Sequence, residues 1–413
     1  MSKKFFVVII SVTLGLFLLS LIGYYFILTG NDDGSSEGTS LFRNFFPFGN
    51  NTDSGQTPRV ETPELPAPQN ENNFTKKLRK ISDNPVAGAG IVDVKAGTII
   101  RHIEKATGHI FETELFSPNQ NRISNTTIPM VYDAIWGNRA LSLMARYLKE
   151  DDYTIDTYSL TVKEVPTLFA TSSPSAENTI SGKIFPINLG DISVYGGSVF
   201  YLEQNQDSSI GYISNFDGKN RKQIWNSPIK ELLSQYVNPK TVALTTKPES
   251  GVLGFLYFVD TSSGSVRKIL GEVPGLSTLV SPDASQIIYL SDGGGTLLSI
   301  YNPKAAYVRT LSPVTFPEKC VWSRKDSTVM YCAVPKESIG YGDLITWYKG
   351  FVSFTDDIWK IDTKNNTANI ILNLSNESGE PIDVIKPLLS DNEQYLVFMN
   401  KRDNTLWSLD LTK

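Results

Sequence analysis

Apolar and polar positions alternate over short stretches through most of the chain, and Pro, Asp, Asn, Gly or Ser bound each stretch. Three stretches align without gaps, at residues 281–289, 323–331 and 390–398. Each begins with Ser, continues through a polar turn, and has an aromatic residue eight positions after the Ser. Polar turns between β-branched or aromatic runs are typical of β-hairpins. The pattern therefore predicts pairs of antiparallel strands.

Further strands follow these hairpins and complete a repeat. Third strands are expected at residues 297–301, 358–362 and 406–410, and outer strands at 266–270 and 308–311. Ser281 and Ser323 are 42 residues apart, the spacing of a four-stranded propeller blade. We predict an all-β, seven-bladed β-propeller over residues 75–413, with blades that begin near Gly88, Met130, Leu189, Tyr236, Leu276, Lys319 and Asp383. A ring of six or eight blades is the alternative, because residues 166–182 cannot be assigned to a particular strand.

The two ends of this region predict how the ring closes. The last repeat stops after its third strand, whereas residues 76–82 resemble the outer strand at 266–270. Leu78, Arg79 and Ile81 are thus expected in the strand that completes the final blade. Such closure removes exposed sheet edges, which would otherwise pair with other chains.

The sixth blade carries an insertion rich in aromatic residues. The spacing of matching Ser residues rises from 42 to 67 between Ser323 and Ser390, and the extra residues fall between strands that end near Ala333 and begin near Asp357. This loop belongs to the face that bears the blade-to-blade connections. Its aromatic residues either contact a partner or form a plug over the central channel. The candidate binding residues are Tyr341, Trp347, Tyr348, Phe351 and Phe354.

Cys320 and Cys332 are the only cysteines, and they lie six residues on either side of Asp326. In a hairpin that turns at Asp326 they face each other on adjacent strands, close enough for a bridge. We predict a disulfide, with two small buried thiols as the alternative.

Residues 5–28 form an uncharged, strongly apolar run. As a helix it is long enough to span a bilayer. Lys3 and Lys4 precede the run and Asp32 and Asp33 follow it, which favours a cytoplasmic N-terminus. We predict a single-pass protein of the cell membrane, with a cytoplasmic stub at 1–4 and a transmembrane helix at 5–28. The propeller is expected on the extracytoplasmic side. A cleaved signal peptide is the competing interpretation.

Residues 29–74 are dominated by polar residues, Gly and Pro, a composition that cannot bury a core. They are expected to form a disordered linker between the membrane and the propeller. Within them, residues 45–48 form an aromatic island that either rests on the membrane surface or docks a partner.

Composition and motifs narrow the function classes. The net charge of −5 is spread along the chain, which argues against nucleic-acid binding. The two histidines, His102 and His109, lack further ligands nearby for a zinc site, and no His-Glu-x-x-His motif occurs. We therefore expect no enzymatic activity, no metal and no cofactor.

The Ser281-Pro282-Asp283 turn, the aromatic residue eight positions after each Ser, and the later strands that end in Asp resemble the WD40-like repeats of TolB-type propellers. With its apolar N-terminal run and acidic linker, the chain also resembles exported, membrane-anchored propeller proteins of small-genome bacteria. The resemblance implies a binding or scaffolding module for an envelope protein or glycan. The alternative is a propeller-fold hydrolase or lyase that acts on an envelope glycan or peptide.

Overall fold

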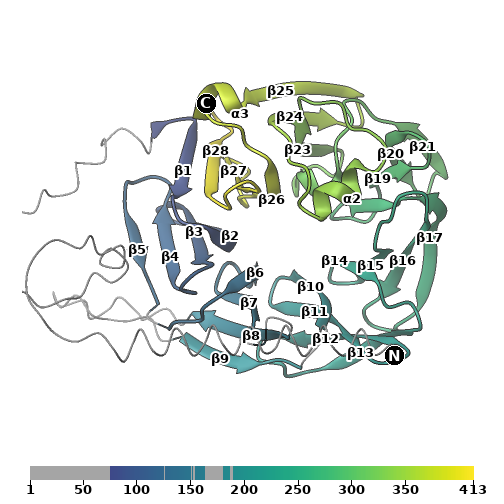
Figure 1. The fold of residues 1–413 in the computed structure, drawn as a ribbon, viewed down its shortest axis with the longest axis horizontal. Helices are drawn as coiled ribbons and strands as arrows, with labels where there is room; N and C mark the ends of the chain where they lie inside the picture. The colour runs from purple at the N-terminus through teal and green to yellow at the C-terminus, as the bar shows by residue number, and fades with distance from the viewer. Residues whose placement is uncertain (1–74, 125, 150, 152–153, 163–179, 187–188) are drawn as a thin grey trace, which may run out of the picture. The chain divides into compact units, whose positions relative to one another are not determined.

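Seven four-stranded antiparallel sheets stand around a common axis in the described part of the chain (Figure 1). The computed structural model describes residues 75–413 except 125, 150, 152–153, 163–179 and 187–188. The all-β, seven-bladed propeller is thereby confirmed. The predicted stub, transmembrane helix and linker lie outside the described residues. Among those that are described, no helix is long and apolar enough to cross a membrane.

Each of the first six blades consists of four consecutive strands, from an inner strand beside the axis to an outer strand at the rim (Figure 1). The first three blades contain β2 (Val86–Val94), β3 (Gly97–Glu104), β4 (Ile110–Glu114) and β5 (Gln120–Arg122); β6 (Val131–Gly137), β7 (Ser142–Leu148), β8 (Ile155–Val162) and β9 (Ile180–Ile184); and β10 (Leu189–Tyr195), β11 (Ser198–Gln204), β12 (Ser209–Asn215) and β13 (Lys222–Ser227).

The next three blades contain β14 (Leu232–Asn238), β15 (Thr241–Thr246), β16 (Leu253–Asp260) and β17 (Val266–Pro274); β18 (Ser277–Val280), β19 (Ile287–Asp292), β20 (Thr296–Asn302) and β21 (Tyr307–Thr310); and β22 (Cys320–Trp322), β23 (Val329–Pro335), β24 (Asp356–Asp362) and β25 (Thr367–Asn373). The seventh contains β26 (Val384–Leu389), β27 (Tyr395–Asn400), β28 (Leu406–Asp410) and β1 (Leu78–Ser82). Short helical elements are η3 (Pro317–Lys319), α2 (Asp343–Tyr348) and α3 (Leu374–Ser378). The inner strands begin within a few residues of the predicted blade starts.

The first described strand closes the ring. β1 pairs antiparallel with β28, and Leu78 lies opposite Leu409. Both leucines are buried, and Ile81 joins a core cluster with residues of blade one. Arg79 donates hydrogen bonds to the carbonyl oxygens of Glu114 and Ser117 in blade one, at 3.3 and 3.0 Å. The closing strand therefore joins the seventh blade to the first through both apolar packing and hydrogen bonds.

The hydrophobic core lies between the blades. Alternate residues of each strand face the neighbouring sheet, and the described residues form seven apolar clusters, one at each blade-to-blade interface. The cluster between blades five and six also takes in residues from the insertion. The insertion is consequently part of the propeller core at its base.

Candidate functional site

The insertion of blade six connects β23 to β24 and contains α2, which lies on the inner side of that blade toward the middle of the ring (Figure 1). Its start is tied to blade five. Asp292 on β19 accepts a hydrogen bond from the Gly342 N–H at 3.0 Å, and Thr296 donates one to the Gly340 carbonyl at 2.9 Å. Gly342 precedes the helix with φ of 82°, a backbone conformation that favours glycine. These bonds fix where α2 begins.

Two of the insertion's aromatic residues form its anchor. Trp347 and Phe354 are only 3% and 5% exposed, and both rings pack on Phe316, with centroids 5.3 and 5.6 Å away. The Trp347 indole N–H donates to both carboxylate oxygens of Asp383, at 3.1 and 3.0 Å. The Phe354 N–H donates to the same carboxylate at 3.0 Å. The loop is thus held by apolar burial and by one buried acceptor.

The other three candidate binding residues remain at the surface. Tyr341, Tyr348 and Phe351 are 58%, 41% and 79% exposed. Phe351 follows Gly350, whose φ of 78° reverses the chain after α2, and the Phe351 N–H donates to the Thr346 carbonyl at 2.9 Å. The turn holds a large apolar side chain in solvent on an ordered backbone.

Tyr348 also reaches inward through its hydroxyl group. That hydroxyl donates to Glu318, which in addition accepts a hydrogen bond from the Ser277 hydroxyl. Burial raises the pKa of the Glu318 carboxyl and raises that of the Tyr348 phenol well above its usual range. Tyr348 therefore connects the insertion to η3, which precedes the inner strand of blade six, and through Glu318 to β18 of blade five.

Polar side chains on the inner strands join neighbouring blades. Asp191 on β10 accepts hydrogen bonds from the N–H and the hydroxyl of Ser234 on β14, at 2.5 and 2.7 Å. Lys386 on β26 donates to Asp133 on β6 and to the Ala87 carbonyl on β2. Burial raises the pKa of Asp191 to about 6, although the Ser234 bonds oppose the shift. Among the described residues, no group of three His, Cys, Asp or Glu side chains is placed to hold a metal ion.

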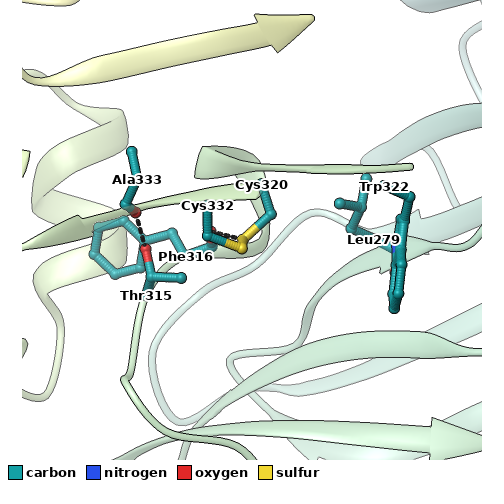
Figure 2. The surroundings of a disulfide bond; sticks show 7 residues. All are labelled: Leu279, Thr315, Phe316, Cys320, Trp322, Cys332 and Ala333. Carbon is teal, nitrogen blue, oxygen red and sulfur yellow. Dashed lines mark hydrogen bonds between the residues drawn. A yellow bond between two sulfur atoms is a disulfide. The ribbon is translucent and has the colours of Figure 1, made fainter. Parts of the chain in front are cut away.

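Cys320 and Cys332 lie opposite each other in the pairing of β22 with β23, and a disulfide joins them, with sulfur atoms 2.09 Å apart (Figure 2). Figure 2 also shows Phe316 beside the bridge, and Thr315 donating to the Ala333 carbonyl at 2.5 Å. The bridge therefore fastens the two strands next to the aromatic ring on which the insertion rests.

The two histidines lie in blade one, one on β3 and the other just before β4. His102 is buried and stacks on Phe111, with ring centroids 5.5 Å apart. Burial lowers the pKa of His102 to about 4. His109 precedes β4, and its Nε2 lies 3.3 Å from the Thr127 hydroxyl. The Nδ1 atom of His102 is buried and has no hydrogen-bond partner among the described residues.

One cluster was absent from the sequence-based candidates. The side chains of Lys319, Asp356 and Asp383 meet with no solvent exposure, and Asp383 is the residue that anchors the insertion. They come from three separate segments, and no local motif marks them. Lys319 follows Glu318 and precedes the apolar residues 320–322, and its partners could not be identified from that spacing.

The fold and this loop define the chain as a seven-bladed β-propeller with an aromatic insertion in its sixth blade. No protein-family model and no curated protein matches the sequence. Among solved structures, an oligogalacturonate lyase in complex with manganese is 10% identical with a TM-score of 0.49, over 80% of this chain and 98% of that one.

Two further solved structures are similar at the same low level. TolB from Acinetobacter baumannii is 12% identical with a TM-score of 0.41, over 78% of each chain. Hydrazine synthase from Kuenenia stuttgartiensis is 12% identical with a TM-score of 0.46, over 70% of this chain and 79% of that one. At these identities the similarities say nothing about what this chain binds or catalyses.

Proposed function

We propose that this propeller is a binding or scaffolding module, anchored in the membrane by residues 5–28 and displayed outside the cytoplasm, where it binds an envelope protein or glycan. The observation that carries the proposal is that some aromatic residues of the blade-six insertion are buried and others are exposed. Trp347 and Phe354 anchor it in the core, whereas Tyr341, Tyr348 and Phe351 are exposed.

Exposed aromatic residues on an ordered loop suit recognition. An aromatic side chain buries about 150–250 Å² when a partner covers it, and aromatic residues are enriched among those that dominate binding energy. The buried anchor lowers the entropy lost on binding, because the loop is already held in one conformation.

The location is tested by protease treatment of intact cells. Lys3 and Lys4 before the apolar run and Asp32 and Asp33 after it support an extracytoplasmic propeller. Added protease should cleave within residues 29–74 and remove the whole propeller from the cells. Protection of the C-terminal residues from added protease would contradict this topology.

Binding is tested by crosslinking in native membranes with two matched variants. The double variant Tyr341→Ala and Phe351→Ala removes two exposed aromatic side chains and leaves the anchor intact. The control, Tyr307→Ala, removes a similarly exposed aromatic, 54% exposed, from the rim strand β21 of blade five. We expect the double variant to lose the crosslinked partner and the control to keep it. Equal crosslinking by both variants would refute the insertion as the binding surface.

The enzyme alternative has one observation in its favour, the carboxyl group of Asp191 on an inner strand. Its pKa, raised to about 6 by burial, resembles that of groups that transfer protons near neutral pH. If the purified propeller cleaved peptides or glycosides from the envelope and Asp191→Asn abolished turnover, hydrolase or lyase activity would replace binding as the function.

A further inference from the structure

Three ionisable side chains meet in the interior beneath the insertion. Lys319 ends η3, Asp356 begins β24 and Asp383 directly precedes β26, and all three side chains have an exposed fraction of 0%. The Lys319 Nζ lies 2.5 Å from Asp356 Oδ2, and it also donates to Asp383 Oδ1. It also donates to the Val384 carbonyl at 3.4 Å. A single amine therefore contacts two carboxyl groups without access to water.

The walls around this amine are aromatic. The Lys319 Nζ lies 5.1 Å from the centroid of the Trp347 ring and 5.8 Å from that of Phe354. Both rings pack on Phe316. Burial of charged groups in such surroundings costs several kcal/mol per ion after relaxation. A reaction that joins the amine to one carboxyl group removes one buried cation and one buried anion at this position.

The two carboxyl groups differ in their hydrogen bonds. Asp383 accepts from the Trp347 indole and the Phe354 N–H as well as from Lys319, so its charge is stabilised on both oxygens. Asp356 Oδ2 accepts from the Val384 N–H at 2.6 Å, whereas its Oδ1 is buried and has no hydrogen-bond partner among the described residues. Burial raises the pKa of Asp356 to about 6, which favours its neutral form. Asp356 thus has the carboxyl group with fewer hydrogen bonds, whereas Asp383 contacts the same amine and is placed to pass protons from it.

We propose that Lys319 and Asp356 become joined by an intramolecular isopeptide bond after the propeller has folded. A bond forms between the Lys319 Nζ and the Asp356 Cγ, and one Cγ–O bond of the carboxyl group breaks. One ammonium proton passes directly to the Asp356 carboxylate, which leaves a neutral amine beside a neutral carboxyl group. The Asp383 carboxylate then takes a second proton from the attacking amine and passes it to the departing hydroxyl group. That hydroxyl group leaves as water, and no oxidant or other reactant is needed. Asp383 ends the reaction as a carboxylate that accepts a hydrogen bond from the new amide.

The geometry supplies what this condensation requires. The nucleophile and the electrophile are held in contact, which replaces a bimolecular encounter by an intramolecular step. The exclusion of water favours amide formation over hydrolysis. The product would covalently join the segment before β22 to the start of β24, at the base of the insertion. Unlike the Cys320–Cys332 bridge, this bond would withstand reducing agents.

The intact mass of the wild-type protein tests the proposal without any substitution. After full reduction of the disulfide, the mass should be lower than that of the sequence by one water molecule. Trypsin should then fail to cleave after Lys319 and should yield residues 310–324 joined to residues 350–360. An unmodified mass after reduction would refute the bond. A junction between residues 310–324 and 365–401 would overturn Asp356 as the acceptor in favour of Asp383.

Two variants separate the roles of the neighbouring groups. Asp383→Asn keeps both reacting side chains and removes the base, so the variant should have the full mass of its sequence. The control, Lys336→Ala, removes a nearby lysine that pairs with Asp357 at 3.5 Å outside the cluster, and it should still lose one water. Loss of water in Asp383→Asn would refute the role given to Asp383. The full mass counts in favour of that role only in variant protein whose circular dichroism spectrum matches that of the wild type, because the bond forms after folding.

Discussion

Replacement of Trp347 by Ala tests whether the base of the insertion belongs to the propeller core. The indole is buried against Phe316 and donates to Asp383, so truncation leaves a cavity and removes one of the three groups that donate to that carboxylate. Truncation of a buried Trp to Ala typically costs about 3–5 kcal/mol, and the loss of a donor to a buried acceptor costs about 1–3 kcal/mol. We expect a total loss in the free energy of unfolding of about 5 kcal/mol.

The loss can be measured as a change in melting temperature. The unfolding entropy of globular proteins is about 2 cal/mol/K per residue, so for a propeller of this length the Tm should fall by roughly 7 °C. The matched variant Phe351→Ala removes an exposed ring and should change stability by less than about 0.5 kcal/mol. Differential scanning calorimetry of both variants, with urea unfolding as a second measure, gives the comparison. Equal melting temperatures for Trp347→Ala and the wild type would refute the role of Trp347 as an anchor of the insertion.

Three further predictions concern pH, the disulfide and ring closure. The pKa of His102 is about 4 when folded and 6.5 when unfolded, so its contribution to stability is present above pH 6.5 and is lost as the pH falls toward 4. Between pH 7 and pH 5 the free energy of unfolding of the wild type should fall by about 2 kcal/mol more than that of His102→Phe, as measured by urea unfolding. Identical pH profiles for the two proteins would contradict the lowered pKa of His102. Mass spectrometry of the non-reduced, alkylated protein should find no free thiol at Cys320 or Cys332, and alkylation of both would refute the disulfide. Reduction of the disulfide should lower the free energy of unfolding by about 3 kcal/mol. Leu78→Ala in the closing strand should cost about 3 kcal/mol, and an unchanged urea midpoint would show that ring closure does not depend on this side chain.

The repeats could be predicted from the sequence because each depends on a local interaction. The Ser281 hydroxyl accepts a hydrogen bond from the Gln286 N–H at 2.9 Å, and the Ser390 hydroxyl accepts one from the Tyr395 N–H at 3.0 Å. Each Ser is buried and bonds across its own turn, so the same residue recurs at the same place in each hairpin. The facing positions of Cys320 and Cys332 followed from the same hairpin geometry.

The division of the insertion into an anchor and an exposed surface could not be predicted. Trp347 and Tyr348 are adjacent, yet one side chain is buried and the other is partly exposed, because α2 turns successive residues in different directions. Which ring faces the core depends on Phe316 and Asp383, and these belong to other segments. The partners of Lys319 were hidden for the same reason, since long-range pairing leaves no spacing rule.

The pairing of β1 with β28 has a consequence for the order of synthesis. β1 precedes every other described strand, whereas its partner follows all of them, so a partly synthesised propeller is an open arc with the edge of β1 unpaired. Contacts this distant in sequence slow folding, and an unpaired edge invites association with other chains. Lys76, Lys77, Arg79 and Lys80 place positive charge along that edge, which discourages such association while the ring is incomplete. These positive charges therefore protect the edge of β1 from other chains until β28 has been synthesised. The pairing of β1 with β28 then joins the last blade to the first.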